Sequence, residues 1–350
     1  CYKFVSKINS PKTLPQAMKT NFFTKIVVSA FLLIIIAYGC TTTTYLIVSE
    51  GESFNALTKI TDNENPCFDS DGGSEGTNLV FTVREKDGSY NIYMKDNVLS
   101  RATIQKTYGT NLNVSPAVCV AKGKIAFQYY DKNNFDIYYV DAYKGKAITQ
   151  VTYTDENEYN PSWNPEGTII IFEKGAQPRS FIAVSEKNNK AAIYNLVTVT
   201  KNQIWLKNLV TGELKMIGEG SFPSISPDGN MIAFIKYDLN KQKNAEVGTL
   251  WIMTIDGDSP RQITTSDLGY AIRPKWSPDG TQIVFQLTKK NKTDSDIYTI
   301  DVNGENLKQH TNNPADDFSP FWSSDGYIYF SSDRGAKKGE YQIWRFKIEE

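Results

Sequence analysis

Histidine is almost absent from this chain of 350 residues, in which His310 is the only one. A metal site built from several histidines, or a triad around any other histidine, is therefore excluded. Cysteine is scarce, and the two that lie beyond the N-terminal region, Cys67 and Cys119, cannot form a disulfide framework. The formal net charge is −1, whereas nucleic-acid binding needs a basic surface, so we expect no nucleic-acid partner.

Helical patterns are also rare. Tyr, Ile, Val, Thr and Phe dominate instead, and these residues fit the pleated surface of a sheet. The length suits one large all-β unit, since barrels and propellers of this size occur as single domains.

No apolar run is long enough for a comfortable membrane span. The longest, Ile26–Ala37, is shorter than the roughly 20 residues that a spanning helix needs. Met18 and the lysines after it precede this run, as in a secretory signal peptide. We therefore interpret residues 1–17 as upstream translation outside the mature protein, and residues 18–39 as a signal peptide.

The apolar run ends at Ala37–Cys40, which resembles a bacterial lipobox. The resemblance implies that Cys40 carries a lipid, that the mature chain begins there, and that residues 40–53 form a lipid-anchored linker. Ordinary cleavage is an alternative, because Ala37 and Gly39 fit the small-x-small rule. Ala37 stands where leucine is usual in a lipobox, and Tyr38 is bulky.

Whether Cys67 and Cys119 form a disulfide bridge between neighbouring repeats of the chain stays open.

A repeat fills the rest of the chain, and it starts at proline anchors that recur about every 50 residues. The anchors, including two degenerate copies at the start, are Pro66, Pro116, Pro161, Pro223, Pro274 and Pro320. A turn follows each anchor, with Ser226–Gly229 and Ser277–Gly280 both reading Ser-Pro-Asp-Gly. Such turns reverse the chain between strands.

After the turn, each repeat continues with an apolar strand such as Ile283–Phe285 and a third strand such as Ile297–Tyr298. A second Gly-containing turn then leads to a fourth strand. Four short antiparallel strands, repeated six times, predict a six-bladed β-propeller over residues 54–350. The last repeat stops at its third strand, so we expect Leu57–Thr61 to supply the fourth strand and to close the ring.

These anchors, turns and strands resemble the repeats of the TolB-like propeller family. The resemblance implies the propeller architecture and does not by itself specify a function. With the lipid anchor expected at Cys40, we expect a place in the bacterial cell envelope, on the periplasmic or outer-membrane side. TolB proteins carry an additional N-terminal α/β domain, for which the residues between Cys40 and the first strand leave no room.

Other motifs have ordinary structural interpretations. His310 replaces an isoleucine of the other repeats on an outer strand. Gly72–Gly76 matches the hydrolase pattern G-x-S-x-G, but it lies in a Gly-rich turn without the strand–elbow–helix setting. Asp131–Asp136 has oxygen donors for Ca²⁺, but not the glycine and distal glutamate of an EF-hand. The Lys174–Asn202 insertion contains apolar stretches that suggest an additional hairpin.

The sequence predicts neither a catalytic site nor a cofactor nor a metal site. We expect a non-catalytic propeller that binds or scaffolds a protein of the envelope. The alternative is a carbohydrate-binding or carbohydrate-active propeller with its site at the channel mouth, and a sensor ectodomain comes third.

The predicted partner-binding residues are acids in the links between blades. They are Asp62, Glu64, Asp155, Glu156, Glu158, Asp267, Asp316 and Asp317. The loops between second and third strands are rich in lysine and share a face with these links. We therefore expect an acidic channel mouth within a basic rim, which would orient a partner.

Overall fold

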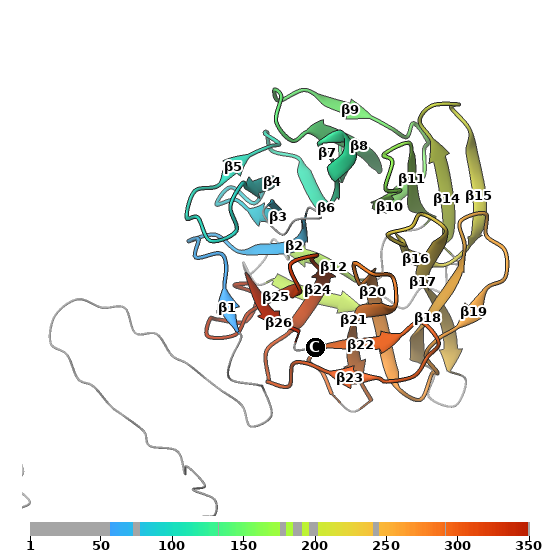
Figure 1. Cartoon of the computed structure of the whole chain (residues 1–350). Helices are drawn as coiled ribbons and strands as arrows, with labels where there is room; N and C mark the ends of the chain where they lie inside the picture. Colours follow the sequence, from blue (N-terminus) through green and yellow to red (C-terminus); the bar gives the residue numbers. More distant parts are fainter. Residues whose placement is uncertain are drawn as a thin grey trace, which may run out of the picture. The chain divides into compact units, whose positions relative to one another are not determined.

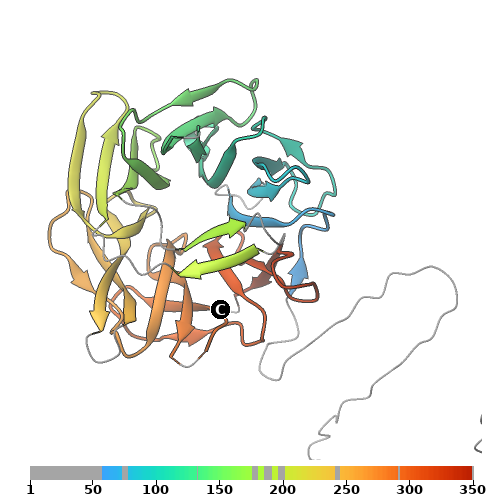
Figure 2. The same cartoon turned by 180° about the vertical axis from the view of Figure 1, so that it is seen from behind.

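The computed structural model describes residues 57–72, 78–131, 133–175, 180–184, 191–195, 202–240, 245–290 and 292–348. Within these residues almost every regular element is a strand, and the strands form six blades of four around a ring (Figures 1 and 2). The fold class predicted from the repeat is therefore confirmed. No helix in this part of the chain is long and apolar enough to cross a membrane.

The blades follow one another in chain order. Blade 1 consists of β2 (Cys67–Gly72), β3 (Leu79–Arg84), β4 (Tyr90–Lys95) and β5 (Ile104–Gln105). Blade 2 consists of β6 (Leu112–Cys119), β7 (Lys124–Tyr130), β8 (Phe135–Asp141) and β9 (Ile148–Gln150). Blade 3 consists of β10 (Asn157–Trp163), β11 (Ile169–Gly175), β14 (Gln203–Asn208) and β15 (Leu214–Glu219).

The second half of the ring repeats this order. Blade 4 consists of β16 (Ser221–Ile225), β17 (Met231–Asn240), β18 (Ala245–Thr254) and β19 (Arg261–Gln262). Blade 5 consists of β20 (Gly269–Trp276), β21 (Gln282–Lys289), β22 (Asp296–Asp301) and β23 (Lys308–Gln309). Blade 6 consists of β24 (Asp317–Trp322), β25 (Tyr327–Ser332), β26 (Gln342–Lys347) and β1 (Thr58–Lys59).

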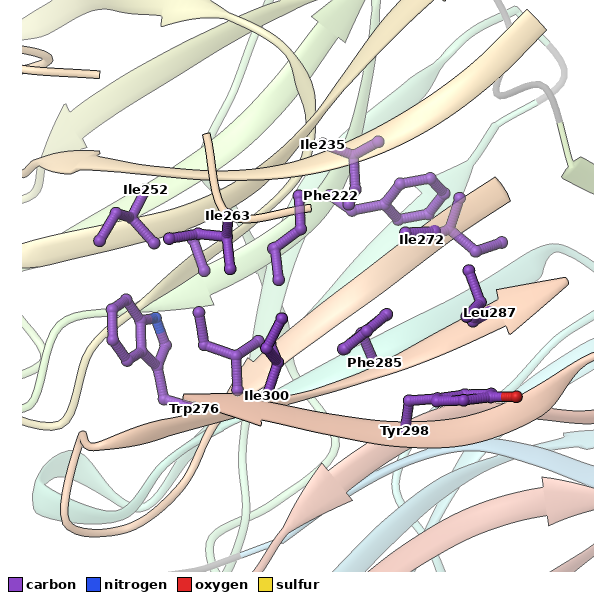
Figure 3. Close-up of a cluster of buried hydrophobic side chains, with 14 residues drawn as sticks. Phe222, Ile235, Ile252, Ile263, Ile272, Trp276, Phe285, Leu287, Tyr298 and Ile300 are labelled. Carbon is purple, nitrogen blue, oxygen red and sulfur yellow. The ribbon is translucent and has the colours of Figure 1, made fainter. Parts of the chain in front are cut away.

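Neighbouring blades are joined by apolar layers. Figure 3 shows the layer between blades 4 and 5, where Ile235 and Ile252 face Phe285 and Ile300. Trp276 extends this layer and donates its indole N–H to the backbone oxygen of Ser224, 2.9 Å away in blade 4. A blade alone cannot bury both faces, so burial of these side chains is the main force that stacks the ring.

The N-terminal strand pairs with the last blade, as predicted. In β1, Thr58 lies opposite Arg345 and Lys59 opposite Trp344 of β26. Just beyond it, the Thr61 hydroxyl accepts the N–H of Ile343 at 2.8 Å and donates to the Gln342 side chain at 2.7 Å.

The same threonine contact recurs in other blades. A threonine after the fourth strand accepts the N–H of a third-strand residue in the pairs Thr107 and Ile92, Thr152 and Ile137, Thr264 and Leu250, and Thr311 and Ile297. Thr61 therefore occupies the fourth-strand position of blade 6, although it lies at the other end of the chain.

Two further features depart from a simple ring of separate sheets. Tyr90 of β4 pairs in parallel with Leu112 of β6, which joins blades 1 and 2 into one sheet. Within the insertion of blade 3, β12 (Ser180–Val184) and β13 (Ala191–Asn195) form the predicted hairpin, with Ser180 opposite Asn195.

Cys67 and Cys119 are both free and buried, so the bridge that the sequence left open does not form. Burial raises the pKa of the Cys67 thiol to about 12, which makes this cysteine inert near neutral pH. Cys40 lies outside the described residues.

Candidate functional site: a central pocket and the face around it

The first strand of every blade carries the same irregularity near the ring axis. Two of its residues oppose one residue of the second strand, and the first of the two has a left-handed backbone. These residues are Asp69, Ser115, Asn160, Phe222, Arg273 and Ser319, with φ between 49° and 55°. Such bulges redirect side chains and often occur beside functional sites.

Proline follows the bulge residue in five of the blades, for example Pro161 after Asn160 and Pro274 after Arg273. Proline is tolerated at a bulge because its missing N–H does not interrupt the ladder there. In blade 1 the equivalent residue is Ser70, which follows Asp69. The sequence-based anchor Pro66 is therefore wrong by four residues, because blade 1 has a serine where the other blades have the marker proline.

The bulge residues line a central pocket of about 60 Å³. Its wall consists of Asp69, Ser70, Ser115, Pro116, Asn160, Pro161, Phe222, Pro223, Arg273, Pro274, Lys275, Ser319 and Pro320. Pockets for small-molecule substrates usually measure roughly 300–1,000 Å³. This one has room for a few waters or the tip of a side chain.

A polar clasp spans the pocket. One carboxylate oxygen of Asp69 in blade 1 accepts hydrogen bonds from the Arg273 guanidinium of blade 5 and from the Ser319 hydroxyl of blade 6. The other oxygen lies 3.3 Å from the Ser115 hydroxyl of blade 2. Because this carboxylate is occupied on both oxygens, it is poorly placed to act as a general base.

The pocket wall is fixed by hydrogen bonds between successive blades. The N–H of Asn160 donates to the Gln128 side chain at 2.8 Å, and the N–H of Phe222 donates to Glu173 at 2.9 Å. The N–H of Asp69 likewise donates to the Ser331 hydroxyl of blade 6, at 3.1 Å. These side chains satisfy amides that the bulges leave unpaired in the sheet, so the wall is rigid.

Charge in the pocket is balanced. Arg273 faces Asp69, and the Lys275 ammonium lies 3.8 Å from Asp71. Arg273 also covers the ring of Phe222, with 5.6 Å between the guanidinium carbon and the ring centre. Within the described residues, no group of three or more His, Cys, Asp or Glu side chains is placed to hold a metal ion.

The predicted acidic residues divide into three groups by exposure. Five are exposed on the face that carries the links between blades: Asp62, Glu64, Asp155, Glu156 and Asp267. Asp316 is half-buried, and burial raises its pKa. Glu158 and Asp317 are buried.

Assigning Glu158 and Asp317 to the contact surface is therefore wrong. Both are strand residues, in β10 and β24, whose side chains point between blades rather than into solvent. Glu158 accepts a hydrogen bond from Thr152 at 3.2 Å, and Asp317 accepts one from Arg334 at 2.6 Å. Burial raises the pKa of Glu158 to about 8 and that of Asp317 to about 7.

The expected separation into an acidic mouth and a basic rim is reduced by ion pairing. Basic residues at or near the loops between second and third strands bind acids of the links in the pairs Lys86 and Glu64, Lys174 and Glu156, and Lys338 and Asp316. Lys86 lowers the pKa of Glu64 by a direct hydrogen bond. The link face therefore presents alternating charge more than one dominant sign.

His310 lies away from the pocket, directly after β23. It stacks on Phe346 with 5.3 Å between ring centres, and its Nε2 atom lies 2.8 Å from the Thr299 hydroxyl. Burial lowers its pKa to about 4, so the ring is neutral near pH 7. The structural interpretation of His310 is confirmed.

Sequence reasoning missed the residues that matter most in the pocket: Asp69, Arg273 and Ser319. A signal was present, because each precedes the anchor position of its repeat by one residue. The prolines mark the repeat, whereas the residue before them differs from blade to blade and forms no repeated pattern.

A family model for the TolB beta propeller domain matches residues 221–350. The Tol-Pal system protein TolB of Francisella tularensis subsp. tularensis (strain WY96-3418) is 22% identical over 270 residues, which cover 67% of this chain and 59% of that protein. The chain has a TolB-like β-propeller. The resemblance expected from the Ser-Pro-Asp-Gly repeats is thereby confirmed.

A solved structure and a second curated relative are also similar to this TolB-like propeller. The solved structure of TolB from Acinetobacter baumannii superposes with a TM-score of 0.58 at 15% identity, covering 79% of this chain and 65% of that one. The uncharacterized peptidase YuxL of Bacillus subtilis (strain 168) is 25% identical over 122 residues, 35% of this chain and 18% of that protein. The chain thus spans less than two thirds of the length of the curated relatives it matches.

Proposed function

We propose that the TolB-like propeller is a non-catalytic binding module of the bacterial cell envelope, and that its partner is a protein. The observation that carries this proposal is the central pocket, which is small, rigid and charge-balanced. Such a pocket suits one protruding side chain of a macromolecule, with the surrounding loops making the remaining contacts. Similarity to Tol-Pal system proteins supports an envelope location.

The proposed contact surface is the link face. Its exposed acids Asp155 and Asp267 lie on links that enter blades 3 and 5. Loops on a rigid scaffold are where proteins concentrate binding residues. Charged loops at the edge of an interface mainly set the association rate and its salt dependence.

The proposal includes attachment to the membrane through a lipid on Cys40. Its support is the lipobox-like Ala37–Cys40 after an apolar run. The lipid would hold the propeller close to a membrane-associated partner on the periplasmic or outer-membrane side.

Catalysis is the weaker interpretation, although propellers of this type also occur in proteins named as peptidases. The Asp69 carboxylate is engaged by three blades, and His310, directly after the outer strand β23, stacks on Phe346 away from the pocket. A glycan ligand would also need a longer groove than a pocket of about 60 Å³ provides.

Affinity capture from detergent-solubilised membranes tests the proposal. The protein should retain a specific envelope protein, and Asp155→Lys with Asp267→Lys should weaken that binding by about three- to tenfold. Asp258→Lys changes an exposed carboxylate on the opposite face and should leave binding unchanged. Equal losses from both variants would place the site elsewhere, and cleavage of a glycan or peptide by the purified protein would reject the non-catalytic assignment.

A further inference from the structure

The face opposite the links carries the short turns between first and second strands and between third and fourth strands. We call it the turn face. In most repeats the first of these turns places an acid before its glycine, as in Glu166–Gly167, Asp228–Gly229 and Asp279–Gly280. Blade 2 differs, because Lys122 precedes the left-handed Gly123 in the turn built on the 3-10 helix η1 (Val120–Lys122).

The turns between third and fourth strands show the same difference in charge between blade 2 and the other blades. In blade 2 two lysines flank the turn glycine, Lys144 and Lys146 around Gly145. In blade 4 two aspartates flank Gly257, and in blade 5 Asn303 and Glu305 flank Gly304. Both turns of blade 2 are therefore basic where their counterparts in other blades are acidic or neutral.

The basic tip of blade 2 also exposes apolar side chains, with Val120 at 52% and Tyr143 at 64% exposure. Its conformation is fixed, because Asp141 accepts the N–H groups of Tyr143 and Lys144 at 2.9 and 2.7 Å. An exposed aromatic ring between ordered lysines is a good contact surface for a complementary protein surface.

Blade 5 presents the complementary chemistry. Asp279 and Glu305 are exposed at its two turns, and Leu307 beside them is 41% exposed. This tip is also ordered: the Ser277 hydroxyl donates to Asp279 at 2.6 Å, and Asn303 donates to Glu305 at 2.9 Å. The exposed charges at the turn glycines are thus lysines in blade 2 and acids in blade 5, each near an exposed apolar side chain.

The two tips lie on opposite sides of the ring, because three steps separate blade 2 from blade 5 in a ring of six (Figure 1). A two-fold axis in the plane of the turn face, perpendicular to the line between these blades, exchanges their positions. We propose that two copies of this chain associate through their turn faces, with the blade 2 tip of each copy on the blade 5 tip of the other.

A second copy fits these observations better than a membrane surface. Anionic headgroups would attract Lys122, Lys144 and Lys146 but repel the acidic tips of blades 4 and 5 on the same face. A two-fold dimer pairs the tips of blades 2 and 5 with each other and is the commonest closed assembly of identical chains. The same axis brings together the first turns of blades 3 and 4, which carry the acids Glu166 and Asp228. Its contacts are exposed ion pairs and two small apolar patches, so the association is weak and salt-dependent.

The test compares the purified protein with two charge-reversal variants by sedimentation velocity. The basic-tip variant is Lys122→Glu, Lys144→Glu and Lys146→Glu. The acidic-tip variant is Glu305→Lys with Leu307→Lys, which leaves the hydrogen bond that caps the Asp279 turn intact. The control, Lys290→Glu with Lys337→Glu, changes exposed lysines of the link face.

The unmodified protein should form dimers at low salt and dissociate as salt rises from about 50 to about 500 mM, as the screening length shortens. Each tip variant alone should be monomeric, the control should behave like the unmodified protein, and an equimolar mixture of the two tip variants should restore dimers. A monomeric unmodified protein, or a mixture that stays monomeric, overturns the proposal. Binding of the unmodified protein to vesicles with anionic lipid, lost in the basic-tip variant without any self-association, would assign the tip to membranes instead.

Discussion

A buried pair of carboxylates between blades 2 and 3 makes the stability of the protein depend on pH. The Thr152 hydroxyl lies 3.3 Å from Asp136 and 3.2 Å from Glu158, and it also accepts the N–H of Ile137. A hydroxyl has one proton to donate, so it can satisfy one carboxylate at a time. No ion pair among the described residues includes either acid.

At the equivalent positions between other blades, the threonine is surrounded by neutral side chains or by acids that are paired with cations. Around Thr107 in blade 1 the two residues are asparagines, Asn91 and Asn113. Around Thr311 the two acids Asp296 and Asp317 each have a cation, Lys292 at 3.2 Å and Arg334 at 2.6 Å. The pair between blades 2 and 3 has the acids without these cations, and burial raises the pKa of Glu158 to about 8.

The pH dependence follows from the pKa values. Glu158 has a pKa of about 8 in the folded protein against 4.5 as its ordinary value. Below the ordinary value both states are protonated, so the stability is fully present. Between the two values folding takes up a proton, and stability falls by up to about 1.4 kcal/mol per pH unit. We therefore expect a loss of about 2 kcal/mol between about pH 5.5 and about pH 7.5.

Glu158→Gln should remove most of this loss, because glutamine mimics the protonated acid at every pH. Urea unfolding at the two pH values measures it, since extrapolating the unfolding free energy linearly to zero denaturant gives the stability in water. Glu156→Gln is the matched control: Glu156 lies two residues earlier, in the link that enters β10, and it is exposed and paired with Lys174. If the free energy of unfolding depends on pH in the same way in the Glu158→Gln variant and the unmodified protein, Glu158 is not the cause of the pH dependence.

Three further predictions concern the fold and the anchor. Thr61→Ala should destabilise the protein by about 1–3 kcal/mol by leaving the Ile343 amide without its acceptor, measured by thermal unfolding; an unchanged Tm would contradict the role of Thr61 in blade 6. Phe285→Ala should cost about 3–5 kcal/mol, because the ring is buried between blades 4 and 5, and a denaturant titration that shows less than 1 kcal/mol would argue against the apolar layer. Cys40→Ala should release the protein from membranes on fractionation, and intact-mass analysis of native protein should show a lipid on residue 40; an unmodified Cys40 would refute the anchor.

Much of the fold could be predicted from the sequence, because each blade carries its own local markers. The Ser-Pro-Asp-Gly turns and the apolar second strands place most strands correctly. The missing fourth strand of the last repeat predicts that Leu57–Thr61 pairs with blade 6, and the structure confirms this with Thr58 opposite Arg345. The proline pattern places the first strand of blade 1 four residues too early, because Ser70 stands where the other first strands have proline. A first strand without this proline cannot be located from local sequence, although its backbone forms the same bulge.

The candidate site was harder to predict. The clasp joins Asp69 to Arg273 across 204 positions of sequence, and nothing local to either residue indicates the other. Glu158 lies two residues after the exposed Glu156, and Asp317 directly follows the half-buried Asp316. Both buried acids lie where the link has already entered a strand, β10 or β24, which local sequence does not show. Charge clusters therefore predicted the face but not which of its acids reach solvent.

The pairing of β1 with β26 also has a consequence for the order of folding. Thr61 and its partner Ile343 are 282 residues apart, so ribosomal synthesis produces one long before the other. Until the last strand emerges, blade 6 lacks a strand and blade 1 lacks its neighbour, which leaves strand edges and apolar layers exposed. Contacts between such distant residues also slow folding. A nascent chain that does not yet contain β26 should therefore depend on chaperones more than a chain that contains it, because β26 completes the pairing with β1 and β25.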